Sequence, residues 1–358
     1  MLKRKTNLIS CDSMAIRVVV NGVGTIGKRV AHAIKLQDDM KLVGIADVAP
    51  TSWLRTVLEP KGPLYKTDLY ASNQDGMKAL TEGGMYVKGL LEDLLASGEV
   101  DVVCDCTPAK IGEKNKPLYQ KYKVKMVFQG GEKAEVADVS FVAIANYEKA
   151  LNKNSVRVVS CNTTSLARTI FTVDQKFGVE EVFAALVRRA TDPWDEKSGP
   201  INAVVPETHV PSHQGPDLQT VLPHINIKTM AVKVPSTLAH LHMITGKIKK
   251  QASSEEFKKA FEEGSRMILL KASHGYAATS EIIERFRDLC RPRYDMYEVA
   301  IWDESITVEK NRFYWIHAVH SEAIVIPETI DAIRAITGIE SDKFKSIEKT
   351  NKALGIEK

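Results

Sequence analysis

The sequence predicts an α/β fold, with a doubly wound parallel sheet in the first half of the chain and an α+β part with a mixed or antiparallel sheet in the second. Two observations carry this prediction. Up to about residue 160, short apolar segments alternate with amphipathic helical ones, which is typical of parallel strands joined by helices. Beyond it, the strand-like segments are longer and alternate polar with apolar residues, which favours antiparallel pairing.

The elements of the first half follow from their apolar content. Residues 16–21 (IRVVVN) form a continuous apolar run, as expected for a strand buried on both faces. A glycine-rich turn and an amphipathic helix to about residue 36 follow it. The remaining expected strands are 41–46, 100–105, 123–129, 141–145 and 156–160, with helices at 51–58 and 90–96.

In the second half, a helix is expected to run through 168–177, where Gly178 suits a C-terminal cap. A loop rich in Pro, Gly and His spans 190–217, and loops of this length are usually functional. The expected strands are 182–188, 227–234, 238–248, 298–306 and 313–320, and the last two helices are 328–337 and 341–354.

Composition excludes several classes of protein. The 358 residues are 44% hydrophobic and 26% charged, which is ordinary for a soluble globular chain, and the net charge of +4 does not predict nucleic-acid binding. No apolar run reaches the roughly 18 residues of a membrane span. Five cysteines argue against a disulfide framework and for the cytoplasm. Residues 1–13 are expected to be a disordered extension, with a transit peptide as the weaker alternative.

A dinucleotide fingerprint lies between the first strand and its helix. Residues 22–27 (GVGTIG) match G-x-G-x-x-G in the context that this motif requires. Gly22 permits the tight turn, Gly24 lets a pyrophosphate approach the backbone, and Gly27 lets the helix pack on the strand. The alternative is a glycine turn that binds nothing.

Asp47 stands where the second expected strand ends, 20 residues after Gly27. A carboxylate there accepts hydrogen bonds from the adenosine ribose and repels a 2′-phosphate, which favours NAD over NADP. The alternative is a solvated aspartate that caps the following helix.

A cysteine stands between a buried strand and a helix, in the run VVSCNTTSL at 158–166. Unpaired backbone N–H groups and the helix dipole favour the thiolate of Cys161. Asn162, Thr163 and Thr164 supply donors for an oxyanion or a phosphate. The alternative is a small buried apolar side chain. A reactive thiol and a nicotinamide site in one chain suggest covalent oxidation of an aldehyde.

A nucleophilic thiol usually has a base, most often a histidine. His240 and His242 share one face of an expected strand, and contact between one ring and the thiolate would explain this placement. A pair of core histidines with satisfied hydrogen bonds is the alternative. Arg188 and Arg189 suit phosphate recognition, or else form a solvated strand end. The cysteines offer no zinc spacing, so no metal site is expected.

The chain resembles archaeal-type glyceraldehyde-3-phosphate dehydrogenases of the phosphorylating kind. The resemblance runs from Met14 to the C-terminus and rests on several separate motifs in the right order. These are NGVGTIGKR at 21–29, FQGGEK at 128–133, SCNTT at 160–164, VPSH at 210–213 and KSIEKTNK at 345–352.

The resemblance implies a covalent reaction in three steps. Cys161 would attack the aldehyde to give a thiohemiacetal, a histidine would take its hydroxyl proton as hydride leaves, and inorganic phosphate would release 1,3-bisphosphoglycerate from the thioester, in glycolysis or gluconeogenesis. The bacterial and eukaryotic branch has that histidine at the position of Arg188. The archaeal branch takes it from the later strand, where the matching residue is His240.

The resemblance also implies binding residues, domains and assembly. A homotetramer is expected, with NAD as cofactor and NADP also open. Residues 14–160 would be an NAD(P)-binding Rossmann domain completed by a C-terminal helix at 325–358, and 161–324 the catalytic domain. The expected contacts to substrate or phosphate are Ser160, Asn162, Thr163, Arg188, Gln214 and Gly215. Those to the cofactor are Thr25, Ile26, Gly131, Arg189 and Ser321, in addition to Gly22, Gly24, Gly27 and Asp47 from the fingerprint itself.

Three positions depart from the family pattern. Archaeal relatives often have a second histidine at Gln214, a glutamine at Ser321, and in several cases a lysine at Asp47.

Two rival functions remain: another thiol aldehyde dehydrogenase of similar architecture, acting on aspartate semialdehyde or erythrose 4-phosphate, or a non-catalytic dinucleotide-binding protein.

Overall fold

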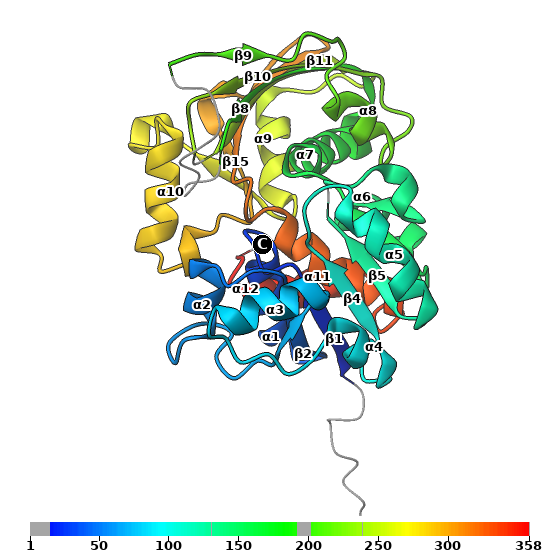
Figure 1. Ribbon diagram of the computed structural model, residues 1–358. Helices are drawn as coiled ribbons and strands as arrows, with labels where there is room; N and C mark the ends of the chain where they lie inside the picture. The colour runs from blue at the N-terminus through cyan, green and yellow to red at the C-terminus, as the bar shows by residue number, and fades with distance from the viewer. Residues whose placement is uncertain (1–14, 130, 192–201, 238, 358) are drawn as a thin grey trace, which may run out of the picture. The chain divides into compact units, whose positions relative to one another are not determined.

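The computed structural model describes residues 15–129, 131–191, 202–237 and 239–357 (Figure 1). Within them, contacts define two compact units: unit 1 holds residues up to 107 together with 114–126, and unit 2 holds 108–113 and everything from 127 onward. The expected extension at 1–13 lies outside the described residues. The domain boundary expected after residue 160 stays a prediction.

The first sheet confirms the predicted doubly wound architecture. It has seven strands in the order β3-β2-β1-β4-β5-β7-β6, and the pairs β1/β2, β1/β4, β2/β3 and β6/β7 are parallel. The strand order reverses at β1, and open α/β sheets bind ligands at such a point. The strands are β1 (Ile16–Asn21), β2 (Met40–Asp47), β3 (Leu69–Ala71), β4 (Val102–Asp105), β5 (Lys125–Phe128), β6 (Val139–Phe141) and β7 (Ser155–Val158).

Helices accompany these strands because each connection returns the chain to the same end of the sheet. Five of them are α1 (Gly27–Lys35), α2 (Ser52–Leu58), α3 (Gln74–Glu82), α4 (Leu91–Ala96) and α5 (Ile111–Lys121). In unit 2, α6 (Ala143–Ala150) packs against the C-terminal helices α11 (Val325–Thr337) and α12 (Lys343–Leu354), and α11 also contacts β7. The end of the chain therefore packs on elements of the first sheet.

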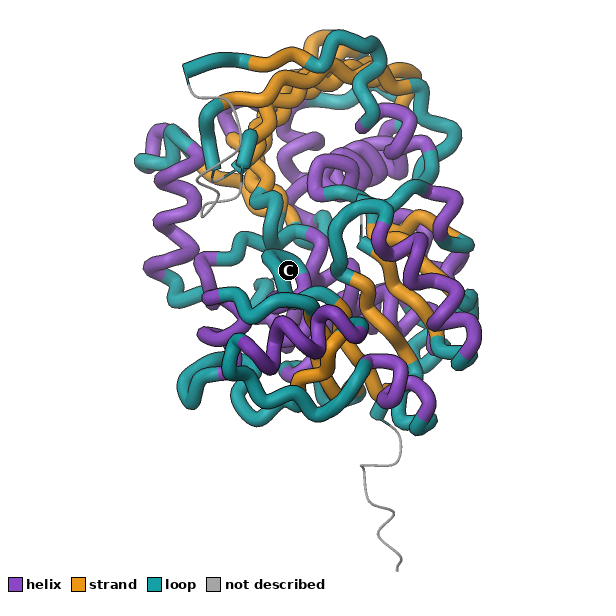
Figure 2. The backbone as a smooth tube through the Cα atoms, in the orientation of Figure 1, coloured by secondary structure: helices purple, strands orange, loops and turns teal. Residues whose placement is uncertain are grey.

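The second sheet is mixed, as predicted. Eight strands pair in the order β12-β13-β15-β11-β8-β10-β9, with β14 beside β15, and Figure 2 draws the strands of both sheets in orange. β8/β10 and β12/β13 are parallel and the other pairs antiparallel. The strands are β8 (Val179–Arg189), β9 (Val205–Pro206), β10 (Ile227–Val234), β11 (His240–Ile248), β12 (Met267–Leu270), β13 (Val299–Trp302), β14 (Thr307–Glu309) and β15 (Arg312–Val319).

Helix α7 (Cys161–Phe177) contacts the three central strands β8, β11 and β15. Its residues 162–170 are all buried, and Gly178 ends it with a φ of 68°, a conformation that glycine adopts without strain. The other helices of this half are α8 (Gln214–Gln219), α9 (Ser254–Glu263) and α10 (Thr279–Asp288). No helix in the described part of the chain is long and apolar enough to cross a membrane.

Some predicted elements have the wrong bounds, and several elements of the structure were not predicted. The strand expected at 141–145 ends at Phe141, because the helix α6 begins at Ala143. The strand expected at 298–306 ends at Trp302, where a 3-10 turn over Asp303–Ser305 follows. The loop 190–217 holds β9 and the start of α8, and part of it lies outside the described residues. The sequence reading also missed β3, α3, α5, α9 and α10.

Candidate active site

The sequence around Cys161 forms a helix start that holds the thiol in place. Strand β7 ends at Val158, and Ser160 takes an extended conformation as the N-cap of α7. Its hydroxyl oxygen accepts a hydrogen bond from the backbone N–H of Thr163 at 3.3 Å, which satisfies one of the unpaired donors of the first turn. Cys161, the first helical residue, is only partly buried.

His240 lies beside the thiol. Its Nε2 is 3.3 Å from the Cys161 Sγ, although the two residues are 79 positions apart in the chain. Strand β11, which begins at His240, is central in the second sheet and packs against α7, so the sheet register fixes this contact. The backbone N–H of Arg189, on the neighbouring strand β8, donates to the His240 Nδ1 at 2.9 Å.

This second hydrogen bond decides the tautomer of His240. A nitrogen that accepts a hydrogen bond carries no proton, so the neutral ring carries its proton on Nε2, facing the sulfur. Burial lowers the pKa of His240 well below 6.5, and the charges of Arg189 and Arg188 and the ring of His320 lower it further. His240 is therefore a neutral ring that presents an N–H to the thiol at physiological pH.

The thiol itself is subject to opposing effects. Burial raises the pKa of Cys161, while the charges of Arg189 and Arg188 and the backbone N–H groups of Asn162 and Cys161 oppose this rise. The predicted influence of the helix start is thus present, but burial outweighs it. The Asn162 side chain adds a second donor, with its Nδ2 at 3.7 Å from the Cys161 Sγ. Two N–H groups therefore face the sulfur.

Thr163 and Ser160 lie beside a buried ion pair. Their hydroxyl oxygens are 2.9 Å apart, and the Thr163 hydroxyl donates to the Asp217 Oδ2 at 2.5 Å. Asp217 is in turn bonded to the Arg157 guanidinium at 2.6 Å. Both hydroxyls are thereby oriented at the N-terminus of α7, where the helix dipole favours an anion.

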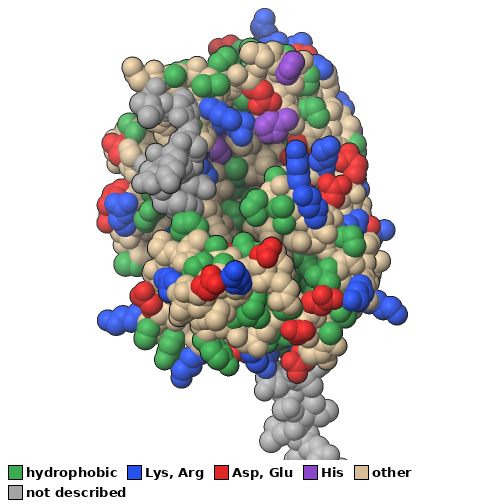
Figure 3. Space-filling view, in the orientation of Figure 1, with side chains coloured by type: hydrophobic (Ala, Val, Ile, Leu, Met, Phe, Trp, Pro, Cys, Tyr) green, Lys and Arg blue, Asp and Glu red, His purple; other side chains and the backbone are tan. Residues whose placement is uncertain are grey.

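The two adjacent arginines face different partners. The Arg188 Nη1 is 3.5 Å from the Glu207 Oε2, and its buried Nε has no hydrogen-bond partner among the described residues. Arg189 donates from Nε to the Ser321 hydroxyl. Arg188 lines a pocket of about 380 Å³ together with Glu207, His213 and Lys233. Figure 3 shows Lys and Arg side chains and His side chains gathered in the upper part of the drawn face, with acidic ones beside them.

Gln214 and Gly215 are both buried at the start of α8. The Gln214 Oε1 accepts from the Ser212 hydroxyl at 2.7 Å, whereas its buried Nε2 has no hydrogen-bond partner among the described residues. The Gly215 N–H donates to the Thr229 Oγ1 at 3.1 Å. A buried donor without a partner is a candidate for contact with a ligand oxygen.

The glycine loop of unit 1 has the form that a pyrophosphate needs. Gly22 has a φ of 89°, and a Cβ on Gly27 would lie 1.8 Å from the Gly22 carbonyl oxygen, so both positions exclude larger residues. A Cβ on Gly24 would meet nothing within 4 Å, which leaves open space for a ligand to approach the backbone. The loop leads directly into α1, with Ile26 as its N-cap and Thr25 before it.

Asp47 lies next to this loop. Its Oδ2 accepts from the Val23 N–H at 2.8 Å, and its Oδ1 accepts from the Val48 N–H at 2.7 Å. The carboxylate thus orients the loop and bonds to the following turn, whereas the N-cap of the next helix, α2, is Thr51. In unit 2, Gly131 leaves room beside Ala109, since a Cβ there would lie 3.4 Å from the Ala109 Cβ.

The sequence reading missed several polar residues of this site. Asp217 and Arg157 orient Thr163, and Glu207 pairs with Arg188 and His213. No local motif distinguishes these residues from surface charges, because their partners are distant in sequence. The described residues contain no group of three or more His, Cys, Asp or Glu side chains that could hold a metal ion.

Comparison with known proteins agrees with this geometry. Residues 160–305 match the family model described as glyceraldehyde 3-phosphate dehydrogenase, C-terminal domain. Three curated relatives named glyceraldehyde-3-phosphate dehydrogenase cover 95–96% of the chain and 99% of their own length. They come from Pyrococcus abyssi (51% identical), Methanosarcina mazei (49%) and Thermococcus kodakarensis (49%). The chain therefore belongs to the glyceraldehyde-3-phosphate dehydrogenase family, whose members are NAD(P)-dependent oxidoreductases.

Proposed function

We propose that this chain is a phosphorylating dehydrogenase that oxidises D-glyceraldehyde 3-phosphate to 1,3-bisphosphoglycerate, with NAD(P)+ and inorganic phosphate. The observation that carries the proposal is the contact between the Cys161 Sγ and the His240 Nε2 at the start of α7. A thiol, a histidine and an anion-favouring helix start at one place suit acyl transfer from a phosphorylated aldehyde.

The reaction begins with loss of the thiol proton to solvent. The Cys161 thiolate then forms a C–S bond with the aldehyde carbon, and the carbonyl electron pair moves to oxygen. The dinucleotide, when bound, supplies the acceptor for the hydride that leaves this carbon. The resulting thioester on Cys161 is attacked by a phosphate oxygen, and the C–S bond breaks to return the thiolate and release the acyl phosphate.

His240 is oriented as a hydrogen-bond donor in this scheme. The base role expected from the resemblance would need a free lone pair on Nε2 and a proton on Nδ1, which the Arg189 N–H faces at 2.9 Å. An N–H on Nε2 instead stabilises the thiolate and then the oxyanion that forms from the aldehyde. Hydride then leaves from an oxyanion, so this step requires no proton acceptor.

We assign phosphate recognition to the positively charged side of the site. Arg188 offers a buried Nε that has no hydrogen-bond partner among the described residues, and the first turn of α7 offers a helix N-terminus beside it, at Ser160 and Thr163. A guanidinium fork and a helix N-terminus are both well suited to phosphate oxygens. Asn162, Gln214 and Gly215 remain proposed contacts to the substrate.

We further propose that NAD is the preferred cofactor. The Asp47 carboxylate stays beside the glycine loop through its bond to Val23, where it would repel a 2′-phosphate. Gly22, Gly24, Thr25, Ile26 and Gly27 would hold the pyrophosphate. Gly131, Arg189 and Ser321 are proposed as further cofactor contacts.

A homotetramer in the cytoplasm completes the proposal. The tetramer rests on the family resemblance, and light scattering coupled to size exclusion measures it directly. The cytoplasmic assignment rests on the cysteines, since Cys104, Cys106, Cys161 and Cys290 are all free thiols.

The deciding experiment follows nicotinamide reduction with glyceraldehyde 3-phosphate and NAD, in the presence and absence of inorganic phosphate. We expect turnover that requires phosphate, because only phosphorolysis releases the acyl group as an acyl phosphate. Turnover without phosphate would indicate hydrolysis and a non-phosphorylating enzyme. Aspartate semialdehyde and erythrose 4-phosphate, tested in parallel, separate the rival dehydrogenases. The absence of any turnover would favour a binding protein.

A further inference from the structure

A chain of four buried side chains leads away from the active-site thiol. It begins at Asn162 on α7, passes through His242 on β11 and His317 on β15, and ends at Trp315 on the same strand. All four are at most 3% exposed. The proposed reaction uses only Asn162, so the two histidines and the tryptophan are polar groups in the core without an assigned role.

The hydrogen bonds between these four side chains all run in one direction, from donor to acceptor. Trp315, the member farthest from the thiol, determines that direction. The Trp315 Nε1 can only donate, and it lies 3.0 Å from the His317 Nδ1. His317 therefore carries its proton on Nε2, which lies 3.0 Å from the His242 Nδ1. His242 must then also carry its proton on Nε2.

The direction continues to the sulfur. The His242 Nε2 lies 2.9 Å from the Asn162 Oδ1, so it donates to the amide oxygen. Because the oxygen of Asn162 is held by His242, its Nδ2 faces the Cys161 Sγ at 3.7 Å. The Ser165 hydroxyl donates to the backbone carbonyl oxygen of Asn162 at 2.9 Å, so its proton does not compete for the His242 Nδ1, which lies 3.2 Å away.

The opposite direction is excluded only at Trp315. If the Asn162 amide were turned over, its NH2 would donate to His242, His242 to His317, and the His317 Nδ1–H would meet the indole N–H. Both directions satisfy every other bond, so the tryptophan decides between them. In the turned state the amide oxygen would face the sulfur and repel its negative charge.

We propose that Trp315, His317 and His242 are positioning residues that orient the Asn162 amide so that its N–H donates to the Cys161 sulfur. This inference rests on the proposed function of Cys161 as the nucleophile. It assigns to three core residues an effect on the reactivity of a thiol that none of them touches.

The two histidines do not affect the Cys161 thiol by gaining or losing a charge. Burial lowers the pKa of His317 to about 3. Burial, His317, His240 and Arg188 together hold the pKa of His242 well below 6.5. Both rings therefore stay neutral around neutral pH. The other groups that act on the sulfur are Arg188 and Arg189 on β8 and His240 on β11.

The test compares Trp315→Phe with the matched control Trp302→Phe, in the full-length protein. The Trp302 indole donates to the Tyr276 carbonyl oxygen at 2.6 Å. Trp302→Phe therefore removes a similar indole N–H that does not belong to the hydrogen-bonded series from Trp315 to Asn162. The rate of iodoacetamide alkylation at Cys161 is measured against pH by peptide mapping, with the exposed Cys290 as internal reference.

We expect Trp315→Phe to shift the alkylation profile of Cys161 to higher pH and to slow alkylation roughly twofold near neutral pH, because without the indole N–H both directions satisfy the remaining bonds and a large share of the Asn162 amides turn their oxygen to the sulfur. Trp302→Phe and Cys290 should behave as in the unmodified protein. An unchanged Cys161 profile in a folded Trp315→Phe variant would overturn the proposal.

Nitrogen-15 NMR of labelled histidines gives a second test that needs no substitution. We expect both His242 and His317 with the proton on Nε2 across the neutral range, and a proton on Nδ1 in either ring would overturn the proposal. This readout also separates the inference from the proposed function. If the wild-type enzyme failed to turn over the aldehyde, the proposed function would be wrong. The tautomers of His242 and His317 would still show whether the hydrogen bonds run from Trp315 to Asn162.

Discussion

At the scale of single residues, the reactivity of Cys161 depends on donors placed against an unfavourable environment. Burial raises the pKa of the thiol, and the structure opposes this with two guanidinium groups, the first N–H groups of α7, and the N–H groups of His240 and Asn162. Desolvation strengthens each of these electrostatic interactions once the thiolate forms. At such a site only a small fraction of Cys161 is thiolate at neutral pH, but the donors stabilise the negative charge that develops when the sulfur attacks the aldehyde.

His240 is expected to be the largest single contributor among these donors. His240→Ala removes the N–H that faces the sulfur at 3.3 Å, and we expect kcat to fall by about 10²–10³-fold. Dinucleotide affinity, measured by fluorescence titration, should stay unchanged, because the expected pyrophosphate-binding loop lies in unit 1. A variant with kcat near that of the wild type would refute the role given to this ring.

At the scale of elements, strand β11 brings the site together. It pairs with β8 and β15, and its alternation places His240 and His242 on the same buried face, as the sequence predicts. Gly246, near its other end, lies opposite Phe313 of β15. A Cβ on Gly246 would lie 2.4 Å from the Phe313 Cζ and 2.3 Å from the Glu181 carbonyl oxygen.

Gly246→Ala should therefore destabilise the protein by overpacking. We expect the free energy of unfolding to fall by about 1–3 kcal/mol, since either the ring or the strand backbone must move. Gly89→Ala is the control, because a Cβ there would make an ordinary contact at 3.5 Å with the Asp93 carboxylate. Denaturant unfolding of both variants measures the difference. Equal stability of the two would show that β11 tolerates a side chain at this position.

The elements also show what the sequence could predict. Long segments with clear periodicity, such as β10 and the helix that begins at Cys161, agree with the prediction closely. Strand β3 has three residues, too few to show a period. Helix α9 carries a capping box of Ser253 and Glu256, a signal that the sequence reading did not use. Contacts between distant segments, such as Thr163 with Asp217, depend on sheet register, which no local pattern encodes.

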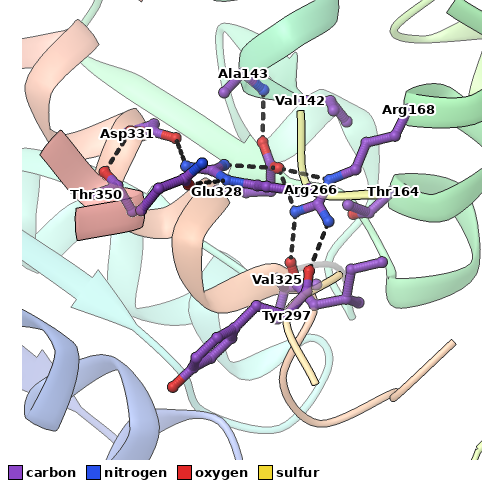
Figure 4. A network of polar contacts seen from close by, with 12 residues as sticks. Val142, Ala143, Thr164, Arg168, Arg266, Tyr297, Val325, Glu328, Asp331 and Thr350 are labelled. Atoms are coloured by element: carbon purple, nitrogen blue, oxygen red, sulfur yellow. Dashed lines mark hydrogen bonds and ion pairs between the residues drawn. The ribbon is translucent and has the colours of Figure 1, made fainter. Parts of the chain in front are cut away.

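At the scale of the whole molecule, a buried ionic network ties the active-site helix to the end of the chain. In Figure 4, the Glu328 carboxylate of α11 is bonded by Arg168 of α7 at 2.6 Å and by Arg266 at 3.1 Å. Its other oxygen accepts from the Ala143 N–H at 2.6 Å. Arg266, directly before β12, continues to Asp331 at 2.6 Å, so α7, β12 and α11 share one set of charges, which α6 joins through a backbone N–H.

The pKa of Glu328 gives this network a defined pH dependence. Burial alone would raise that pKa, but the charges of Arg168 and Arg266 outweigh burial and hold it below the ordinary value of 4.5. A carboxyl group whose pKa is lowered by folding stabilises the folded state above its unfolded pKa. That stabilisation is lost as the pH falls from about 4.5 through the lower folded value.

Glu328→Gln should consequently cost about 3–5 kcal/mol of unfolding free energy at neutral pH, since it removes the carboxylate charge that Arg168 and Arg266 share in the core. The difference from the wild type should shrink as the pH falls below 4.5, where the wild-type carboxyl becomes protonated as well. Glu284→Gln is the control: its pair with Arg287 is also 2.6 Å long but about half exposed, so its loss should cost well under 1 kcal/mol. Equal losses in the two variants would mean that burial does not decide the strength of these ion pairs, and the coupling of the active-site helix to the C-terminal helices would have to rest on apolar packing alone.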